Sequence, residues 1–396
     1  MNKKLLAVAV AGALAAPIAA FAQSTVTIYG RANAGLDNWK ATGSSAGAVG
    51  DYRARTRVYD SGSRVGFRGT ENLGGGMEAY FVMEAGVNID SGLGLGQSTA
   101  ANVSTGSIAS RDSFVGIKGG WGEVSWGRQS IFWGNGLNSQ TGPNYINSAV
   151  DGMLNGTGLV AIPVSRQSNV MAYTSPRLGG MFDITASFSP TREAATAGPS
   201  VNGTTTVTSD NIYGLTGKFR SGPWYAQADW ARTKLDATRG GAKNTGAKIG
   251  ASYGYAPDSR VALIYERNRN NGIGAAIGTS ALVGDSLRQR VWVFNVEHAM
   301  GAWRLYGLYA NAGAIRGATG ATGNTGTKST GWTLGTKYMF SPRTGVYASY
   351  NKITNGSAAF ADLNGGGYSS AAGGALAAAN AGADLRVWGL GMMHNF

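Results

Sequence analysis

Two arginines at alternate positions of one short segment are the residues best placed for electrostatic chemistry. In segment 63–69, Arg64 and Arg68 alternate with Val65 and Phe67. Successive side chains of a strand point to opposite faces, so the two guanidinium groups share one face of a predicted strand. In a narrow water-filled lumen such a pair would attract anions. A solvated position at a rim explains each arginine equally well.

A predicted first strand carries another arginine in the same kind of pattern. Val26 and Ile28 alternate with Thr27 and Tyr29, and Arg31 continues the polar face. Arg31 and Arg68 are therefore further candidates to line a lumen. The alternating basic residues at positions 53, 55 and 57 precede a break at 60–62, and we assign them to a first long loop.

Catalytic chemistry has little support in the sequence. The chain has no cysteine and only two histidines, His298 in a predicted tight turn and His394 on the apolar face of the last segment. No group of His, Asp and Glu has the spacing of a metal site or of a catalytic nucleophile with its base. We expect no enzyme activity, no bound metal and no cofactor.

The longest loop, residues 131–165, combines apolar residues with a single acid, Asp151. A fully solvated loop would not need that apolar content. Folding back into a lumen would bury the apolar side chains and narrow the passage. Packing against neighbouring loops outside the lumen is the alternative.

The segment 385–396 indicates what kind of element positions these charges. Trp388, Leu390 and Met392 share a large apolar face, whereas Gly389 and Gly391 lie on the opposite, small face. In water such a strand would be prone to aggregate. The pattern fits a strand of a membrane β-barrel, with its apolar face toward lipid and its edges paired.

The regular alternation of short turns and long loops along the chain predicts the number of strands. Short Gly, Pro, Asn or Ser turns occur near 71–76, 118–123, 175–180, 220–223, 256–259, 298–301 and 341–344. Long polar stretches occur near 38–60, 89–108, 131–165, 190–209, 234–246, 267–287, 312–329 and 354–384. Seven short turns and eight long loops join sixteen antiparallel strands. A barrel of that size has an interior too wide for side chains to fill, and therefore implies a channel.

Composition supports an exported all-β protein. Residues 1–22 have the basic start, apolar run and small-residue cleavage site of a secretory signal peptide, which leaves residues 23–396 as one barrel domain. Glycine is abundant (63 residues) and only 14% of residues are charged. The formal net charge is +13, but the basic residues are dispersed, with no basic helix or stripe to bind nucleic acid.

Several motifs resemble the trimeric general porins of Gram-negative outer membranes, of the beta-proteobacterial type. The matching segments are 24–30, 63–76, 111–116, 126–129, 173–176, 338–344 and 391–396, in family order along the chain. The resemblance implies a homotrimer of sixteen-stranded barrels whose third loop folds into the lumen. It also implies a constriction with a basic wall formed by Arg64, Arg111 and Arg166, facing the acids Glu84 and Asp151. The third loop departs from the family pattern, because it lacks the usual acidic and Gly-Phe-rich composition.

From these patterns we expect an integral outer-membrane channel for passive diffusion of ions and small hydrophilic solutes, with mild anion preference. Its expected surroundings are outer-membrane lipid, lipopolysaccharide and two further copies of itself, without nucleic acid. One alternative is a substrate-selective channel, which a ladder of aromatic and basic residues in the lumen would mark. Another is a barrel that mainly displays its loops as an adhesin, in which case deletion of residues 131–165 would leave conductance unchanged.

Overall fold

The computed structural model describes residues 25–90, 108–132, 166–190, 211–234, 243–271, 286–317, 326–359, 361 and 381–396. For residues 275–277 and 280–282 it gives the path of two short strands. The predicted signal peptide and most of the predicted third loop lie outside these ranges. No helix within them combines the length and the apolar character needed to cross a lipid bilayer.

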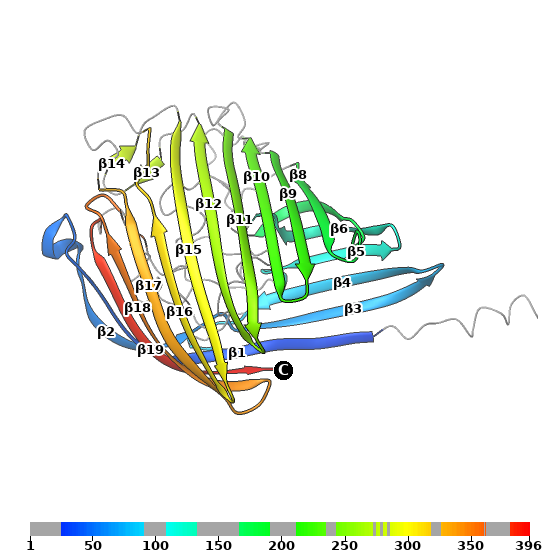
Figure 1. Cartoon of the computed structure of the whole chain (residues 1–396), viewed down its shortest axis with the longest axis horizontal. Coiled ribbons are helices and arrows are strands. Elements are labelled where there is room, and N and C mark those ends of the chain that lie inside the picture. Colours follow the sequence, from blue (N-terminus) through cyan, green and yellow to red (C-terminus); the bar gives the residue numbers. More distant parts are fainter. Residues whose placement is uncertain are drawn as a thin grey trace, which may run out of the picture.

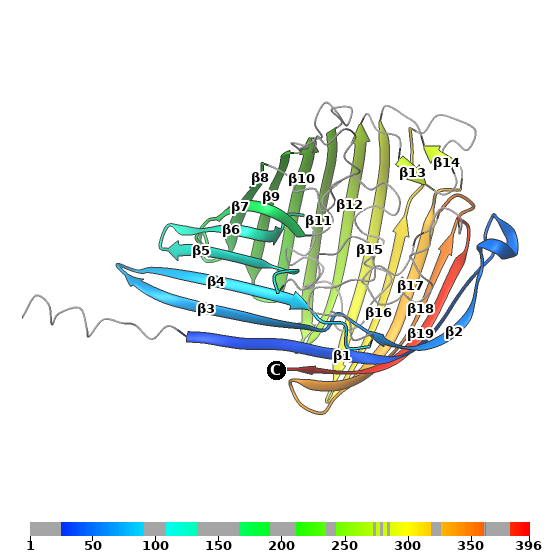
Figure 2. The same ribbon diagram turned by 180° about the vertical axis from the view of Figure 1, so that it is seen from behind.

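One antiparallel sheet, closed into a barrel, dominates the molecule (Figures 1 and 2). Each strand pairs with its neighbours in the chain, and β1 (Thr25–Thr42) closes the ring by pairing with β19 (Asp384–Asn395). The sheet contains 17 labelled strands, but β2 (Tyr52–Asp60) and β3 (Arg64–Gly74) both pair with the same side of β1. They are two halves of one bent strand, so the barrel has sixteen strands, as the turn pattern predicts.

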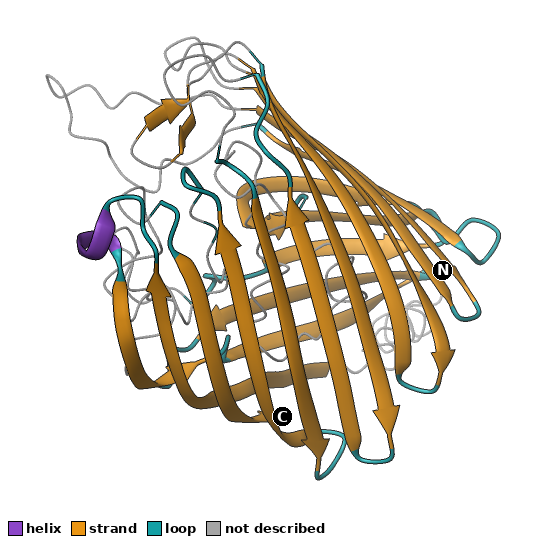
Figure 3. Ribbon diagram, turned by 60° about the vertical axis from the view of Figure 1, so that its left-hand side comes forward, coloured by secondary structure: helices purple, strands orange, loops and turns teal. Residues whose placement is uncertain are grey.

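The remaining strands follow in chain order around the ring. Those before the barrel's midpoint are β4 (Met77–Gly86), β5 (Ser113–Gly119), β6 (Gly122–Ser130), β7 (Arg166–Thr174), β8 (Phe182–Ser189) and β9 (Asn211–Ser221). They continue as β10 (Trp224–Lys234), β11 (Lys243–Ala256), β12 (Ser259–Asn271), β15 (Leu287–Met300), β16 (Trp303–Ala312), β17 (Ser329–Met339) and β18 (Thr344–Asn355). A separate hairpin, β13 (Ala275–Ile277) and β14 (Ser280–Leu282), and a short 3-10 helix, η2 (Gly47–Gly50), lie at the loop end (Figure 3).

Alternation along the strands separates an outer apolar face from an inner face, as the sequence predicts. In β19 the side chains of Trp388, Leu390 and Met392 are 45–52% exposed, whereas those of Val387 and Met393 are 1–3% exposed. The apolar outer face meets lipid in an outer-membrane barrel, and the inner face lines the lumen. The same alternation of exposed and buried residues occurs in β10 and β11.

Ring closure depends on a glycine in the first strand. The backbone N–H of Gly30 donates to the Phe396 carbonyl at 3.0 Å, and the Phe396 N–H donates to the Gly30 carbonyl at 3.1 Å. The Phe396 ring occupies the space that a Cβ of residue 30 would need. A larger residue at position 30 would therefore displace the aromatic ring that covers this end of the seam.

The seven short turns are confirmed, but the first long loop was placed wrongly. Positions 53, 55 and 57 lie on β2, paired with β1, so only residues 43–51 connect the two strands. The break at residues 60–62, which we interpreted as the end of a loop, is a kink in the strand. There the Asp60 carboxylate accepts hydrogen bonds from the Gly62 and Ser63 N–H groups. Sequence alone did not show that pairing resumes on both sides of the kink. His298 likewise lies within β15, which continues to Met300 before the turn.

Candidate functional site

The predicted acid Glu84 is the centre of a charged cluster on the inner wall. Glu84 lies on β4, and its carboxylate forms an ion pair with the Nε of Arg111 and a second, at 3.6 Å, with the Nε of Arg64. The hydroxyl of Tyr29 donates to the same carboxylate at 3.2 Å. Three of the predicted constriction residues are thus brought together around one buried carboxylate, with Tyr29 as a partner that the sequence did not single out.

A glycine on the strand between Tyr29 and Glu84 leaves room for the tyrosine to reach the carboxylate. Tyr29 of β1 lies opposite Gly66 of β3, and Gly66 lies opposite Glu84 of β4. A Cβ at position 66 would stand 2.5 Å from the Tyr29 ring. Because Gly66 has no side chain, the tyrosine can cross over β3 to reach the carboxylate on the next strand.

Arg166, the third predicted wall arginine, does not bind Glu84. Its Nη2 lies 3.0 Å from the Asp112 carboxylate. Arg128 lies beside this pair. It donates to the Ser110 carbonyl at 3.1 Å and to the Ser168 hydroxyl at 3.2 Å, and these serines are two residues from Asp112 and Arg166 in the chain. Arg128 and Asp112 were missed by sequence reasoning, although both lie in motifs that carry the family resemblance.

A β-bulge interrupts the alternation of side chains around Arg128. Pairing of β6 with β7 shifts register between Gly127 and Gln129, and Gly127 has a φ of +144°. Within the same irregularity on β7, Asn169 takes a φ of +57°, which few residues other than glycine, Asn and Asp adopt. Bulges re-aim side chains next to functional sites, and this one breaks the period-two pattern on which a sequence reading depends.

The two further lumen candidates lie on either side of the Glu84 cluster. Arg31 stands directly opposite Arg64, and its Nε donates to the Asn395 side chain at 3.2 Å. Arg68 lies farther toward the turn end, with its guanidinium 5.2 Å from the centre of the Tyr29 ring.

The second predicted acid, Asp151, lies outside the described residues, as does the path of the third loop beyond residue 132. The start of that loop is described. Ile131 and Phe132 are buried against Val170, Ile212 and other residues of the inner wall, and the Lys248 ammonium lies 4.3 Å from the centre of the Phe132 ring. Entry of the chain into the barrel interior agrees with the inward fold expected for the loop.

The inner-wall cluster carries an excess of positive charge. Four guanidinium groups, from Arg64, Arg111, Arg128 and Arg166, accompany the carboxylates of Glu84 and Asp112, which leaves a net charge of +2. Charges on rigid strands beside a confined aqueous path act on passing ions more strongly than charges in open solvent. Such a cluster can favour anions without binding any of them tightly.

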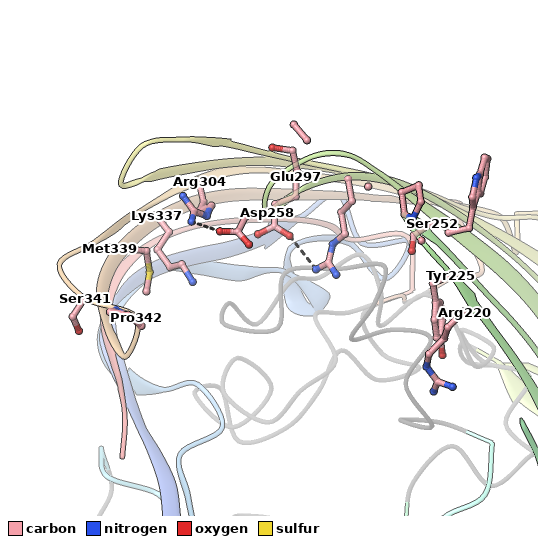
Figure 4. A pocket seen from close by; sticks show the side chains of 17 residues that line it. Arg220, Tyr225, Ser252, Asp258, Glu297, Arg304, Lys337, Met339, Ser341 and Pro342 are labelled. Carbon is pink, nitrogen blue, oxygen red and sulfur yellow. Dashed lines mark hydrogen bonds and ion pairs between the residues drawn. The ribbon is translucent and has the colours of Figure 1, made fainter. Parts of the chain in front are cut away.

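A second charged region lines the lumen at the turn end, in a cavity of about 880 Å³ (Figure 4). Arg304 forms an ion pair with Asp258 at 2.7 Å, and Arg260 forms one with Glu297 at 3.0 Å. Lys337 also lines this cavity. Sequence reasoning missed the group because its members come from four strands and from the turn that holds Asp258, and no distinctive motif marks them.

Within the described ranges, no cluster of three or more His, Cys, Asp or Glu side chains has the proximity of a metal site. The two histidines contact neighbouring side chains on the outer face. Tyr255 shares a 3.0 Å hydrogen bond with the His298 Nδ1, and Thr344 shares one of 2.9 Å with the His394 Nδ1.

Comparison with known proteins matches residues 7–358 to a family described as Gram-negative porin. The major outer membrane protein P.IB of Neisseria meningitidis serogroup B is 33% identical over 185 residues, which are 46% of this chain and 47% of that protein. The chain thus aligns with about half the length of the Neisseria relatives. An outer membrane porin protein of Bordetella pertussis is 28% identical over 392 residues, covering 89% of this chain and 94% of that one.

Solved structures show the same architecture. An anion-selective porin from Comamonas acidovorans superposes with a TM-score of 0.69 at 22% identity, covering 94% of this chain and all of that chain. OmpF of Salmonella typhi, in a complex with daunomycin, superposes with a TM-score of 0.60 at 14% identity, covering 94% and 97%. At these identities the likeness concerns the fold.

Proposed function

Since this chain belongs to the Gram-negative porin family, we propose that it forms a water-filled channel for passive diffusion of ions and small hydrophilic solutes. The chain is an integral barrel of the bacterial outer membrane, and its family consists of channel proteins rather than enzymes. A ring of sixteen strands leaves a lumen that side chains cannot fill. The observation that carries the proposal is the inner-wall cluster around Glu84, which places fixed charges beside that lumen.

Mild anion preference is the second part of the proposal. The inner-wall cluster has the net charge of +2 described above, and Arg31 adds a further positive charge beside it. Arg64, Arg111 and Arg166 are assigned to the basic wall, and Glu84 to the acidic side. Asp151 is assigned to the same acidic side from the third loop. Arg68 is assigned to the lumen wall below the cluster.

Homotrimer formation is the third part. The outer wall over β1, β2, β16, β17, β18 and β19 has an apolar groove of about 680 Å³, lined by Ala34, Val58, Trp303, Ala348, Leu390 and others. Small apolar side chains allow the backbone of a second copy to approach closely. Native mass spectrometry of the purified protein in neutral detergent would report the number of copies in the assembly, and a Val58→Arg substitution should lower that number. Lipopolysaccharide and other outer-membrane lipids would cover the rest of the apolar wall.

The decisive experiment is the zero-current potential of the purified protein in a planar bilayer under a salt gradient. We expect open steps with a potential that favours anions. Arg64→Glu combined with Arg166→Glu changes the cluster from +2 to −2 and should reverse the sign of the potential. The matched control is Arg177→Glu with Arg343→Glu, which makes the same charge change at exposed positions of two turns.

Each part can fail separately. Open steps without ion preference would keep the channel and remove the role of the arginines. A folded, heat-modifiable oligomer without conductance would favour the display alternative, which also predicts no effect of deleting residues 131–165. Saturable conductance for one solute class would favour the substrate-selective alternative.

A further inference from the structure

A group of arginines faces outward at the loop end of β12 and β15. Arg267 and Arg269 lie near the end of β12, and Arg288 and Arg290 lie at the start of β15. All four are exposed and alternate with buried residues such as Glu266 and Gln289, so they project away from the lumen. Together with Arg316 we call them the rim arginines (Figure 1 shows the ends of these strands).

The register of the sheet places the rim arginines face to face. Arg267 is the direct cross-strand partner of Arg290, and Arg269 is the partner of Arg288. Like charges directly opposite each other destabilise a sheet. Among the described residues, no carboxylate forms an ion pair with any of the five. This arrangement therefore lowers the stability of the barrel unless an anion lies between the guanidinium groups.

Local contacts hold the rim arginines in this arrangement. The Ser286 hydroxyl accepts a bond from the Arg269 Nε at 3.0 Å and one from the Arg288 Nε at 3.4 Å. Arg316 joins through two backbone bonds with Arg288, each of 2.9 Å. Gly317 has a φ of +88°, and a Cβ there would collide with the Ser286 carbonyl, so glycine allows the close approach.

The result is a cavity of about 330 Å³ lined by Arg267, Arg288, Arg290 and Arg316, with no acid among the described residues of its lining. Arginine presents a planar fork of donors that matches the oxygens of a phosphate group in bidentate geometry. Four such forks around one small cavity suit a multiply charged phosphate better than a chloride ion or a single carboxylate.

The height of the cavity on the barrel indicates where that phosphate comes from. The next outward positions toward the turn end are Tyr265 and Trp292, whose ring centres are 4.3 Å apart. Leu263 and Phe294 follow, 49% and 48% exposed. Aromatic side chains form a girdle at the membrane interface with the apolar band beyond it, so the rim arginines stand at the level of the lipid headgroups.

The neighbouring strands show the same asymmetry between the two ends. On β10, Arg232 faces outward above Trp230, with its guanidinium 5.3 Å from the ring centre. At the turn end of β10, β11, β12 and β15, the outward strand positions of the described chain include Trp224, Tyr253 and Val261 but no Arg or Lys. On these four strands, the outward Arg and Lys residues of the described chain are therefore concentrated at the headgroup level of the outer leaflet.

We propose that the rim arginines form a binding site for the phosphate groups of a lipid in the outer leaflet. The lipid phosphate would lie in the cavity between β12, β15 and Arg316, with its acyl chains along the apolar wall below the Tyr265–Trp292 pair. This inference rests on the proposed function in one respect, the outer-membrane location of the barrel. It does not depend on ion selectivity, because the rim arginines face away from the lumen.

The test is a titration of the purified protein in neutral detergent with bisphosphorylated lipid A, followed by native mass spectrometry. We expect Arg267→Gln with Arg290→Gln to weaken lipid A binding about 30-fold, from the loss of two charges near a lipid phosphate. Arg177→Gln with Arg343→Gln, at exposed turns of the opposite end, is the matched control and should bind like the parent protein. Single-channel conductance is measured on the same samples and should be unchanged in both variants.

Three outcomes would overturn the site. Equal lipid A affinity in the rim variant and the parent protein would remove the arginines from binding. Equal affinity of the parent protein for lipid A and for fully dephosphorylated lipid A would remove the phosphate. Equal thermal stabilisation of the parent protein by inorganic phosphate, at the concentration used for the lipid, would indicate a site for free phosphate. A comparison of thermal stabilisation of the parent protein by the two forms of lipid A needs no variant, and stabilisation by the phosphorylated form alone supports the site.

Discussion

Arginines on the inner wall and arginines on the outer rim are held in opposite ways. On the inner wall, Arg64 and Arg111 both meet the carboxylate of Glu84. On the rim, Arg267 meets Arg290 across the strand pair, without an acid from the described chain. The inner arginines are fixed by the protein itself and leave a modest excess of charge. No acid of the described residues compensates the rim arginines, and in our proposal their charge binds a ligand outside the chain.

The difference shows that the residue facing an arginine decides what the arginine does. An ion pair inside a barrel stabilises the fold and tunes the field in the lumen. Facing arginines lower the intrinsic stability of the sheet but create an anion site. Substitutions should therefore have opposite effects on stability in the two regions.

The largest effect is expected from Arg57→Gln on the inner wall. Arg57 contacts both carboxylate oxygens of Asp37 at 3.1–3.3 Å, and the Asp37 side chain is 0% exposed. Its loss leaves a buried carboxylate without this partner, which should lower the free energy of unfolding by about 3 kcal/mol. The measurement is the urea midpoint of unfolding in detergent, with Arg386→Gln on the outer face as control. Equal midpoints for the two variants would contradict the comparison.

A smaller loss is expected from Gly66→Ala. The new methyl group would meet the Tyr29 ring at 2.5 Å and push the tyrosine away from Glu84. Overpacking of this kind lowers stability by about 2 kcal/mol. Gly217→Ala is the matched control, because nothing lies within 4 Å of a Cβ at that position. If both variants unfold at the same urea concentration, Tyr29 is not held over position 66.

Glu84→Gln should change ion selectivity rather than abolish conduction. It raises the charge of the inner-wall cluster from +2 to +3 and should increase the anion-to-cation permeability ratio about twofold to threefold at 0.1 M salt. The zero-current potential measures this ratio. The increase should shrink at 1 M salt, where the screening length falls to about 3 Å. The rim variant Arg267→Gln with Arg290→Gln serves as control, and a similar shift there would contradict the assignment of those arginines to the outer face.

The smallest effect has the opposite sign. Arg267→Gln alone should raise the free energy of unfolding in neutral detergent by about 0.5 kcal/mol, because it removes one of two facing charges. With bisphosphorylated lipid A present, the same variant should be less stable than the parent protein. Urea titrations with and without the lipid test both signs, with Arg177→Gln as control. Destabilisation of Arg267→Gln in plain detergent would show that the facing arginines are compensated within the protein.

The sequence alone determined the faces of regular strands and the sites of the short turns. Period-two alternation in β19 is local, and it identified Trp388 and Leu390 as outward residues without any knowledge of their neighbours. Alternation also placed Arg64 on the inner face. The family motifs added Arg111, Arg166 and Glu84 as candidates, but not which arginine would contact which acid.

Tertiary structure decided the pairings, because strand register depends on residues far apart in the chain. Gly66 lets Tyr29 reach Glu84 only in the register that aligns three strands, and Arg267 faces Arg290 only in the register of β12 with β15. The kink at Asp60 and the bulge at Gly127 interrupt alternation, so local patterns misplaced Arg57 and missed Arg128. Composition and spacing can show that a barrel has many arginines, but only the closed sheet assigns each arginine a carboxylate, a second arginine or an external anion.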